Sequence, residues 1–504
     1  MNWKSLLPLA AIILFSACQK IDLDLDPKKH SEDISSFSQI SSINIGGEAA
    51  AEISAFDPKT NKLFVITNAD EATEIEVLDL TNPEVPVTIG SINIASYGGN
   101  VNSVDVSDGK LAAAVEGFTK TDNGKIVIFS TSDYTEIAQV TVGALPDMVT
   151  YSPDGKYILS ANEGEPSADY SVDPVGTISI ISVKDNYSVK TLDFSDFASQ
   201  ESSLKAKGFR IFGKHASFAQ DIEPEYLTIS ADSRTAWVTL QENNGIAKID
   251  VESNKIISIF PLGFKNYNLA KNYIDPSDFN KAFTPGQWNV KGVYMPDGIA
   301  VVEEFGIPFL FTANEGDARE YPDAGFVEIK RTKNVTLDPT AFPNAAILQE
   351  DANLGRLNIT TTLGDADADG DFDELYSFGA RSFTVWNGLN GQLLFDSENN
   401  LDEITSAASF YDDGRSDDKS VEPESVIIGT VGKQKLAFVG MERADAVAIY
   451  DLSNCNSPKF VKVLKVGDAP EGLLFVNAKD SPNKKSLLIV SNEGDGTVKI
   501  FSTN

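Results

Sequence analysis

The sequence predicts an all-β protein, a single β-propeller of eight four-stranded blades, with seven blades as the alternative. A polar tag follows an apolar run three times, and each tag lies downstream of a Pro-acid pair. From residue 38 onward, short β-rich runs alternate with Asp-Gly and Asn-Gly turns, and almost no long stretch has helical period. The tags are Asn162-Glu163-Gly164-Glu165, Asn314-Glu315-Gly316-Asp317 and Asn492-Glu493-Gly494-Asp495, and the pairs are Pro146-Asp147, Pro296-Asp297 and Pro470-Glu471.

The spacing between each pair and its tag fits two strands joined by one hairpin turn. The start of the first strand and the end of the second strand then lie at the same edge of the sheet. If this unit repeats around an axis, the carboxylates of all units gather on one face. The same pattern therefore predicts both the fold and a site.

Most units show four strands, A to D. The clearest unit has runs at 148–152, 157–161, 177–181 and 189–192. Because the last unit stops after strand C, we expect the N-terminal run 40–45 to supply its outer strand and so close the ring. Strand A is expected near Ala49, Ser103, Met148, Tyr226, Gly298, Leu357, Ser425 and Gly472, and the other C strands at 75–79, 125–129, 246–250, 326–329, 382–386, 447–451 and 497–501.

Four long segments interrupt the repeats, at 194–222, 263–295, 339–356 and 397–421. We expect each to connect strand D of one blade with strand A of the next, on the same face as the tags. Loops gathered on one face of a rigid scaffold commonly carry binding residues.

Composition narrows the choice of partners. The chain has 504 residues, and 41 basic against 74 acidic residues give a formal net charge of −33. Nucleic acid is therefore not an expected partner, because phosphate backbones require clustered Lys and Arg. Cations are the natural counter-ligands of such a chain.

The N-terminus predicts a lipoprotein signal. Lys4 precedes the apolar run 6–17, which is too short to span a bilayer, and Ser16-Ala17 places small residues before Cys18. We expect a signal peptide over 1–17, a lipidated Cys18 with a flexible tether over 18–37, and the propeller over 38–504. The alternative is a plain secretory signal with an incidental cysteine. The expected location is the outer membrane, on the cell surface or the periplasmic side, with the bilayer as partner through acylated Cys18.

An acidic mouth is predicted where strands A start and strands B end. Many like charges at close range raise one another's pKa unless cations neutralise them, and hard oxygen ligands suit Ca²⁺ or Mg²⁺. The alternative is that the tags are only turn chemistry. The predicted acidic mouth consists of Asp147, Glu163, Glu225, Glu242, Asp297, Glu315, Glu424, Glu442, Glu471 and Glu493, with Glu116 at the corresponding position of the second unit.

The sixth predicted unit departs from this pattern. Its alignment puts Arg381 where the acidic tag should be and Arg356 at the start of strand A. Arginine forks beside hard cations are what a phosphate ester requires, although simple ion pairing with the acidic mouth is an alternative. The phosphate-binding candidates are Arg319, Arg356, Arg381, Arg415, Lys419 and Arg443.

A run of alternate aspartates predicts a second cation site. Gly370 holds the sixth position, as in a calcium loop, but Tyr376 stands where an EF-hand has Glu. We expect structural Ca²⁺ in the A–B hairpin of the sixth unit, on the face opposite the tags; the alternative is an acidic turn without metal. The expected ligands are Asp365, Asp367, Asp369, Asp371 and Asp373.

Several motifs together resemble the choice-of-anchor I family, which is similar to the mesenchyme-specific cell-surface glycoproteins of biomineralising animals. The resemblance spans about residues 38–502 and implies an exported, anchored β-propeller. Some relatives carry alkaline-phosphatase labels, and the fold resembles phytase-like propellers. The motifs are Ala161-Asn162-Glu163-Gly164-Glu165, Glu223-Pro224-Glu225, Pro296-Asp297-Gly298, Asn314-Glu315-Gly316-Asp317, Gly379-Ala380-Arg381 and Glu422-Pro423-Glu424.

Two functions follow from these observations. One is a calcium-binding module for adhesion to a glycan, a polyanion or a protein. The alternative is a calcium-dependent phosphoric ester hydrolase. We favour the binding module, because the sequence identifies no catalytic base.

Overall fold

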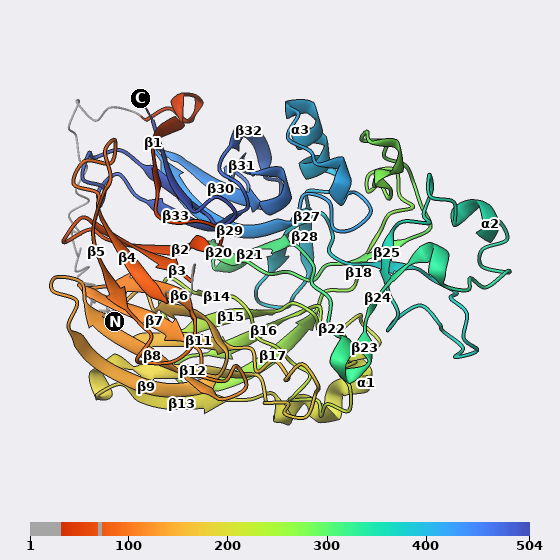
Figure 1. Cartoon of the computed structure of the whole chain (residues 1–504), viewed down its shortest axis with the longest axis horizontal. Coiled ribbons are helices and arrows are strands. Elements are labelled where there is room, and N and C mark those ends of the chain that lie inside the picture. Colours follow the sequence, from red (N-terminus) through yellow and green to blue (C-terminus); the bar gives the residue numbers. More distant parts are fainter. Residues whose placement is uncertain (1–31, 69–72, 504) are drawn as a thin grey trace, which may run out of the picture. The chain divides into compact units, whose positions relative to one another are not determined.

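The computed structural model describes residues 32–68 and 73–503, which belong to one compact unit (Figure 1). The predicted signal peptide, Cys18 and residues 19–31 of the expected tether lie outside these residues. Residues 32–37, also expected in the tether, pack instead on the last two sheets. Ile34 and Phe37 are buried there, and Glu32 accepts hydrogen bonds from the backbone N–H of Ser486 (2.6 Å) and its hydroxyl (2.9 Å).

The first four sheets of the described chain are antiparallel and follow one another in sequence, four strands each. They contain β2 (Ala50–Asp57), β3 (Lys62–Thr67), β4 (Glu74–Asp79) and β5 (Val87–Asn93); β6 (Val101–Ser107), β7 (Lys110–Val115), β8 (Asn123–Ser130) and β9 (Glu136–Ala144); β10 (Pro146–Tyr151), β11 (Tyr157–Asn162), β12 (Thr177–Ser182) and β13 (Ser188–Leu192); β14 (Leu227–Ile229), β15 (Thr235–Leu240), β16 (Gly245–Asp250) and β17 (Lys255–Pro261).

Three further four-stranded sheets complete the set. They contain β20 (Ile299–Glu304), β21 (Ile307–Asn314), β27 (Ser382–Asn387) and β28 (Leu393–Asp396); β29 (Pro423–Val431), β30 (Gln434–Met441), β31 (Ala446–Asp451) and β32 (Lys459–Lys465); β33 (Pro470–Val476), β34 (Leu487–Asn492), β35 (Thr497–Ser502) and β1 (Ser38–Asn44). As predicted, the N-terminal strand β1 pairs with β35 and is the outer strand of the last sheet.

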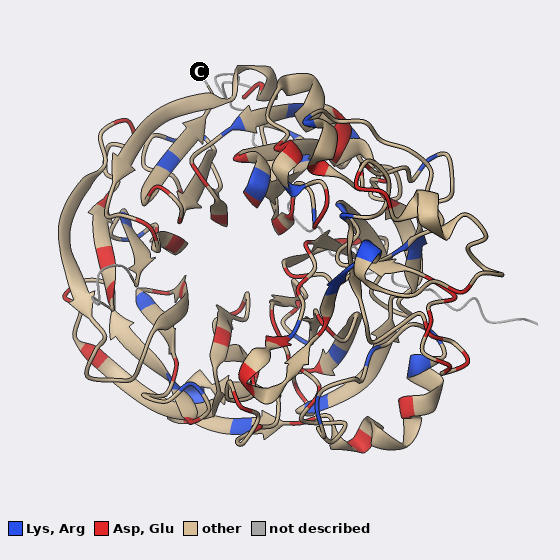
Figure 2. Cartoon of the chain, turned by 45° about the vertical axis from the view of Figure 1, so that its right-hand side comes forward, with Lys and Arg blue, Asp and Glu red and all other residues tan. Residues whose placement is uncertain are grey.

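The sheets are repeated around a common centre. Their first strands contact one another in the order β2, β6, β10, β14, β20, β29 and β33, and β33 contacts β2. Figure 2 shows this arrangement, with acidic residues at strand ends that face the centre. Radial repetition of four-stranded sheets defines a β-propeller. The predicted all-β propeller architecture is therefore confirmed, and the described residues form seven four-stranded sheets, the number given as the alternative.

Burial follows from this arrangement. Middle strands lie between neighbouring sheets and are apolar on both faces; all six residues of β34, for example, are buried. The outer strand β5 is mostly exposed. The continuous apolar runs of the sequence are therefore the middle strands.

The prediction of eight blades was wrong because two predicted units form one sheet. Strand β27 pairs with β21, with Asn314 opposite Ser382 and Phe311 opposite Val385. Phe383, Val385 and Trp386 are buried in this pairing. The run 326–329 was expected to fill that place, but its side chains are too exposed for a middle strand, apart from Glu328.

Residues 315–381 are consequently one long insertion between the second and third strands of the fifth sheet. The segment 339–356 lies inside this insertion. The expectation that it connects two blades was therefore wrong. The segments 194–222, 263–295 and 397–421 do connect the last strand of one sheet with the first strand of the next. All four segments leave the sheets at the same end.

The insertions carry small elements of their own, to the side of the sheets in Figure 1. None of the helices among the described residues is long and apolar enough to cross a membrane. The small elements are β18 (Phe264–Asn266), β19 (Lys291–Val293) and β26 (Tyr376–Ser377) in one sheet, the pairs β22 (Glu320–Tyr321) with β23 (Phe326–Val327) and β24 (Ile329–Arg331) with β25 (Asn358–Thr360), and the helices α1 (Glu201–Lys205), α2 (Ala345–Leu348) and α3 (Asn400–Ala408).

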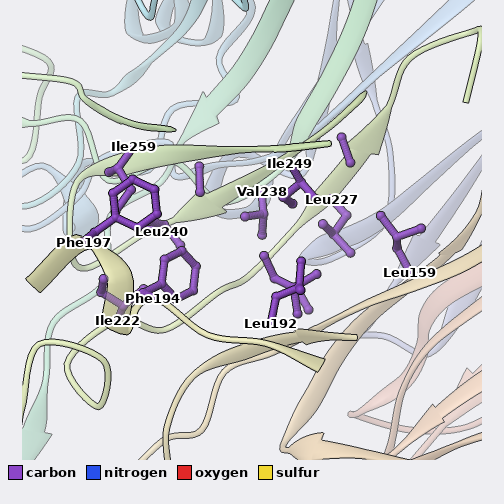
Figure 3. Close-up of a cluster of buried hydrophobic side chains, with 14 of the residues drawn as sticks. Leu159, Leu192, Phe194, Phe197, Ile222, Leu227, Val238, Leu240, Ile249 and Ile259 are labelled. Atoms are coloured by element: carbon purple, nitrogen blue, oxygen red, sulfur yellow. The ribbon is translucent and has the colours of Figure 1, made fainter. Parts of the chain in front are cut away.

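The core lies between adjacent sheets and extends into the insertions. Figure 3 shows the cluster between the third and fourth sheets, where Leu159 and Leu192 lie near Leu227 and Val238. Phe194 and Phe197 of the 194–222 segment complete this cluster. Full burial of such a side chain contributes about 1.5–3 kcal/mol, so this connection is held as part of the core.

A titratable carboxyl group, that of Asp105, links the second sheet to the third. The Asp105 carboxylate of β6 accepts hydrogen bonds from the backbone N–H of Tyr151 (2.7 Å) and the hydroxyl of Thr150 (3.1 Å), both on β10. Burial raises the pKa of Asp105 to about 6. The folded chain therefore holds this proton at pH values where the unfolded chain has released it.

We predict that Asp105→Asn removes this contribution to the pH dependence. Below pH ~4 the carboxyl is protonated in both states, and above pH ~6 it is ionised in both. As the pH rises from 4 to 7, the wild type should lose about 2 kcal/mol of unfolding free energy relative to the variant. Denaturant unfolding at pH 4 and pH 7 measures this, with the exposed Glu84→Gln as control. An equal pH dependence of variant and wild type would contradict the assignment.

Candidate functional site

The predicted acids at the strand A starts meet at one end of the ring. Asp147, Glu225, Asp297, Glu424 and Glu471 line one cavity of about 160 Å³ together with Glu315. The second sheet contributes Asn102 to this cavity instead of an acid. The first sheet places Glu52 at the equivalent position. Sequence reasoning missed it because no proline precedes it.

A left-handed residue precedes four of these strands. Leu145, Met295, Glu422 and Ala469 have φ between 46° and 49°, and each is followed by proline. Non-glycine residues adopt this conformation at a cost, and such strain concentrates at functional sites. The proline ring also restricts the residue before it, which makes the repetition more unusual.

The backbone carbonyls of these left-handed residues connect the Pro-acid pairs with the tags through hydrogen bonds. The backbone N–H of Glu163 donates to Leu145 O (2.9 Å), that of Glu442 to Glu422 O (2.9 Å), and that of Glu493 to Ala469 O (3.0 Å). Each bond places the carboxylate at the end of strand B beside the one at the start of strand A.

The tag asparagines have a structural task. The buried Asn162 side chain donates to Thr177 O (3.2 Å) and to the hydroxyl of Ser179 (3.1 Å) on the next strand. Asn314 and Asn492 make equivalent contacts to Thr384 and Thr497. The asparagine fixes the strand end, and the glutamate that follows it is left for the site.

Three acids form the tightest group. One carboxylate oxygen each of Asp147, Glu163 and Glu225 lies within 4.8 Å of the other two. Burial, then the neighbouring carboxylates, raises the pKa of Glu163 and Glu225 well above the usual range. Burial raises the pKa of Asp147 to about 7, and Asp147 shares a hydrogen bond with Glu163.

Glu242 lies beside this group. Its side chain is 4% exposed, and its Oε2 has no hydrogen-bond partner. The Glu242 carboxylate contributes to raising the pKa of Glu163 and of Glu225. A buried, unpartnered carboxylate oxygen next to three others is what a bound cation would satisfy. We call Asp147, Glu163, Glu225 and Glu242 the four-acid group.

A second group of acids is neutralised by the protein itself. Carboxylate oxygens of Glu315, Glu422 and Glu442 also lie within 4.8 Å of one another. Arg415 Nε donates to Glu422 (2.9 Å), and Lys419 Nζ lies 3.2 Å from the same carboxylate. The group is completed by Arg443, whose guanidinium lies 2.9 Å from Glu442 and 3.5 Å from Glu422, and by a bond from Lys419 to Glu315.

The other predicted phosphate ligands do not join this group. Arg319 is buried against Asp221 (3.1 Å) and Glu223 (2.9 Å), and Arg356 pairs with Asp278 and Asp417. The expected single basic sector is therefore wrong, because only Arg415, Lys419 and Arg443 lie together.

Arg381 is a structural cross-link. It is 1% exposed and donates to the backbone carbonyls of Asp275 (2.7 Å), Ser416 (2.7 Å) and Asp418 (2.9 Å). It does not replace an acidic tag in a blade of its own. It closes the long insertion immediately before β27 and joins it to two other segments.

The remaining acids of the mouth fit the same pattern. Burial raises the pKa of Asp297 and Glu424, which share a hydrogen bond, and of Glu471 well above the usual range. Burial raises the pKa of Glu442 to about 7, and it also raises the pKa of Glu493.

The aspartate loop lies in the long insertion, between β25 and β26, and not in an A–B hairpin as predicted. Oxygens of Asp365, Asp367 and Asp373 lie within 4.8 Å of one another, and Asp338, Asp371 and Asp373 form a second such set. Asp369 belongs to neither set. Asp338 comes from a separate turn, and no motif in the sequence pointed to it.

Two further acids of the site region begin a repeated Glu-Pro-Glu motif, of which only the second glutamate was expected in the acidic mouth. Glu223 and Glu422 each precede Pro-Glu, and both are almost fully buried in ion pairs with the basic residues described above. The repeated Glu-Pro-Glu was the signal that could have identified them.

The fold and site define an acidic-mouthed, seven-sheet β-propeller. The choice-of-anchor I domain model matches residues 52–455, so the chain belongs to that family, as the motifs indicated. The chain is 29% identical over 188 residues to Gigasin-3a of Magallana gigas, covering 31% of this chain and 66% of that protein. It is 25% identical over 312 residues to the mesenchyme-specific cell surface glycoprotein of Strongylocentrotus purpuratus, covering 53% and 40%. The chain thus spans less than two thirds of either relative.

Solved structures resemble the chain only distantly. Kuenenia stuttgartiensis hydrazine synthase aligns with a TM-score of 0.49 and 12% identity, covering 92% of this chain and 97% of that chain. The WD40 domain of Toxoplasma gondii coronin aligns with a TM-score of 0.45 and 8% identity, covering 92% and 87%.

We predict that Arg381→Ala destabilises the fold. The change leaves three buried carbonyls without their donor, so the unfolding free energy should fall by about 3 kcal/mol or more. Arg443→Ala is the control, because this side chain is 41% exposed and should cost no more than about 1 kcal/mol. Denaturant unfolding of both variants measures this. An Arg381→Ala protein as stable as the wild type would contradict the structural role.

Proposed function

We propose that this protein is a cell-surface binding module whose ligand face is the acidic mouth, with a divalent cation in the four-acid group. The observation that carries the proposal is the convergence of Asp147, Glu163 and Glu225 beside the unpartnered Oε2 of Glu242. Among the described residues none of these four acids forms an ion pair, and three carboxylates this close together favour proton or cation binding. The name of the sea-urchin relative supports a surface location.

Calcium suits the site best by its chemistry. Ca²⁺ takes six to eight oxygen ligands in flexible geometry and accepts carboxylates, whereas Mg²⁺ requires a near-ideal octahedron and retains water. The cation would lower the repulsion between the carboxylates and leave coordination positions for oxygens of a ligand. That ligand would be a glycan, a polyanion or a protein.

A second calcium ion in the aspartate loop belongs to the same proposal. Asp373 is shared by both sets of close carboxylates there, so we assign it as the central ligand. This ion would stabilise the long insertion. Anchoring through acylated Cys18 at the outer membrane, on the cell surface or the periplasmic side, completes the proposal.

Hydrolysis of a phosphate ester is the second candidate. The group formed by Arg415, Lys419 and Arg443 favours it, because it lies beside Glu315, which lines the same cavity as Asp147 and Glu225. Cations on one side and guanidinium groups on the other could hold a phosphate. Each of the three basic side chains, however, already pairs with a carboxylate, so binding without catalysis is the better supported function.

We predict two calcium sites that can be removed separately. Calorimetry should detect both sites in the wild type and only the mouth site in Asp373→Asn. It should detect neither site in the triple variant that combines Asp373→Asn with Glu163→Gln and Glu225→Gln. With chelator, the Glu163→Gln and Glu225→Gln variant should melt at a higher temperature than the wild type, because its carboxylate repulsion is reduced. Glu84→Gln, on the exposed surface, should change neither measurement. Unchanged calcium binding without Glu163 and Glu225 would refute the mouth site.

We also predict no metal-dependent phosphatase activity. 4-Nitrophenyl phosphate and phytate should be hydrolysed no faster with calcium than with chelator, and no faster than by the Glu163→Gln and Glu225→Gln variant. Calcium-dependent turnover that is lost in Arg443→Ala would instead establish the hydrolase. Arg443 serves this test better than Arg381, since its loss should leave the fold intact.

A further inference from the structure

Three partly exposed aromatic side chains lie together on the mouth side of the propeller. Tyr170 packs edge-to-face against Tyr321, with ring centroids 4.8 Å apart, and against Phe326 at 5.9 Å. Tyr321 and Phe326 lie opposite each other on β22 and β23. Among the described residues, no protein group forms a hydrogen bond with either tyrosine hydroxyl. We call Tyr170, Tyr321 and Phe326 the aromatic cluster.

The aromatic cluster is close to the four-acid group. Burial raises the pKa of the Tyr321 hydroxyl, and the nearby carboxylates of Glu165, Glu223 and Glu242 raise it further. Glu223 likewise interacts with Tyr170. The same carboxylates therefore act on both the tyrosines and the proposed cation site.

The hairpin that carries Tyr321 and Phe326 is rigidly attached to this site. Glu328 accepts a hydrogen bond from the backbone N–H of Arg319 (3.2 Å), which closes the hairpin. The Arg319 side chain in turn forms ion pairs with Asp221 and Glu223. Glu223 lies two positions before Glu225 of the four-acid group. All of these side chains are buried.

The turn that carries Tyr170 is equally fixed. The backbone N–H of Tyr170 donates to Ser167 O (2.7 Å), and that of Ser167 to Val172 O (2.8 Å). Gly176, at the end of this loop, approaches Ile222 O so closely that an added Cβ would lie 1.8 Å from it. The aromatic surface is therefore pre-organised, which reduces the entropy lost on binding.

We propose that the aromatic cluster is a saccharide-binding platform and that the ligand of the module is a glycan; this rests on the proposed cation site. Aromatic faces pack against the C–H face of a sugar ring, while a few fixed polar groups set its orientation. Sugar hydroxyls supply neutral oxygen ligands for the cation and hydrogen-bond partners for the free tyrosine hydroxyls.

The other ligand classes fit less well. A polyanion would meet the carboxylates of Glu165, Glu223 and Glu242. The basic side chains of this region are already engaged: Arg319 pairs with Asp221 and Glu223, Lys120 pairs with Glu165, and Lys214 donates to the backbone carbonyl of Ala324. A protein partner would need about 800 Å² on this side. The exposed apolar side chains around the cluster are single valines, Val172, Val175 and Val327.

Electrophoresis through gels containing neutral galactomannan, with the polyanion polygalacturonate as comparison, tests this inference. With calcium, galactomannan should retard the wild type and chelator should abolish the effect, whereas retardation by polygalacturonate alone would favour a polyanion ligand instead. Tyr321→Ala and Tyr170→Ala should weaken the apparent affinity at least tenfold, whereas Tyr321→Phe should retain most of it. Calcium binding measured by calorimetry should stay unchanged in all three, which also shows that they are folded.

Tyr134→Ala is the matched control for Tyr170→Ala. Tyr134 is also partly exposed, also has a positive φ and also makes an edge contact, with Phe64, but it lies on a turn at the opposite end of its sheet. It should leave retardation unchanged.

The outcomes separate the two proposals. Absence of calcium binding at the four-acid group would refute the proposed function itself. Calcium binding without retardation by either polysaccharide would overturn the glycan assignment and favour a protein ligand. Retardation that is equal in wild type, Tyr321→Ala and Tyr170→Ala would overturn the platform.

Discussion

The structure depends on one geometric constraint: seven inner strands begin at the same end of one narrow channel. The side-chain position at the start of each of these strands is therefore brought close to the corresponding positions of the other strands. In this chain that position is acidic in all sheets but the second, which has Asn102. The carbonyls of the strained residues before three of the strands then fix a second acid beside the first. Negative charge accumulates at the mouth because the backbone places all of these strand ends there.

The protein manages this charge differently on the two sides of the ring. Around Glu422, three basic side chains from the 397–421 segment and the sixth sheet balance the acids. Around Glu163 the balance is missing, apart from Lys120, which pairs with Glu165. The cation site and the aromatic cluster are both assigned to the less balanced side. Buried arginines join segments far apart in sequence on both sides, Arg319 beside the four-acid group and Arg381 at the 397–421 segment.

Much of the fold could be read from the sequence because a repeated sheet repeats its signals. The Pro-acid pairs and the tags identified most strand A starts and strand B ends correctly, and hence the six acids that line the cavity. The blade count failed at the fifth sheet, where a long insertion separates the strands that pair. A run such as 326–329 has strand-like composition, and only the register of β21 with β27 decides against it. The basic residues were misplaced for the same reason, because ion pairs between insertions leave no periodic signal.

The pairing of β1 with β35 has a mechanical consequence. Glu32 bonds to Ser486 and Thr503, and the strand that follows it is held by a ladder from Ser38 to Asn44. A pulling force that reaches residue 32 from the N-terminal side is therefore borne first by these contacts. Because β35 is the third strand of the same sheet as β33, the load passes into the sheet that contributes Glu471 to the cavity. Tension on the chain and occupancy of the mouth thus act on the same sheet.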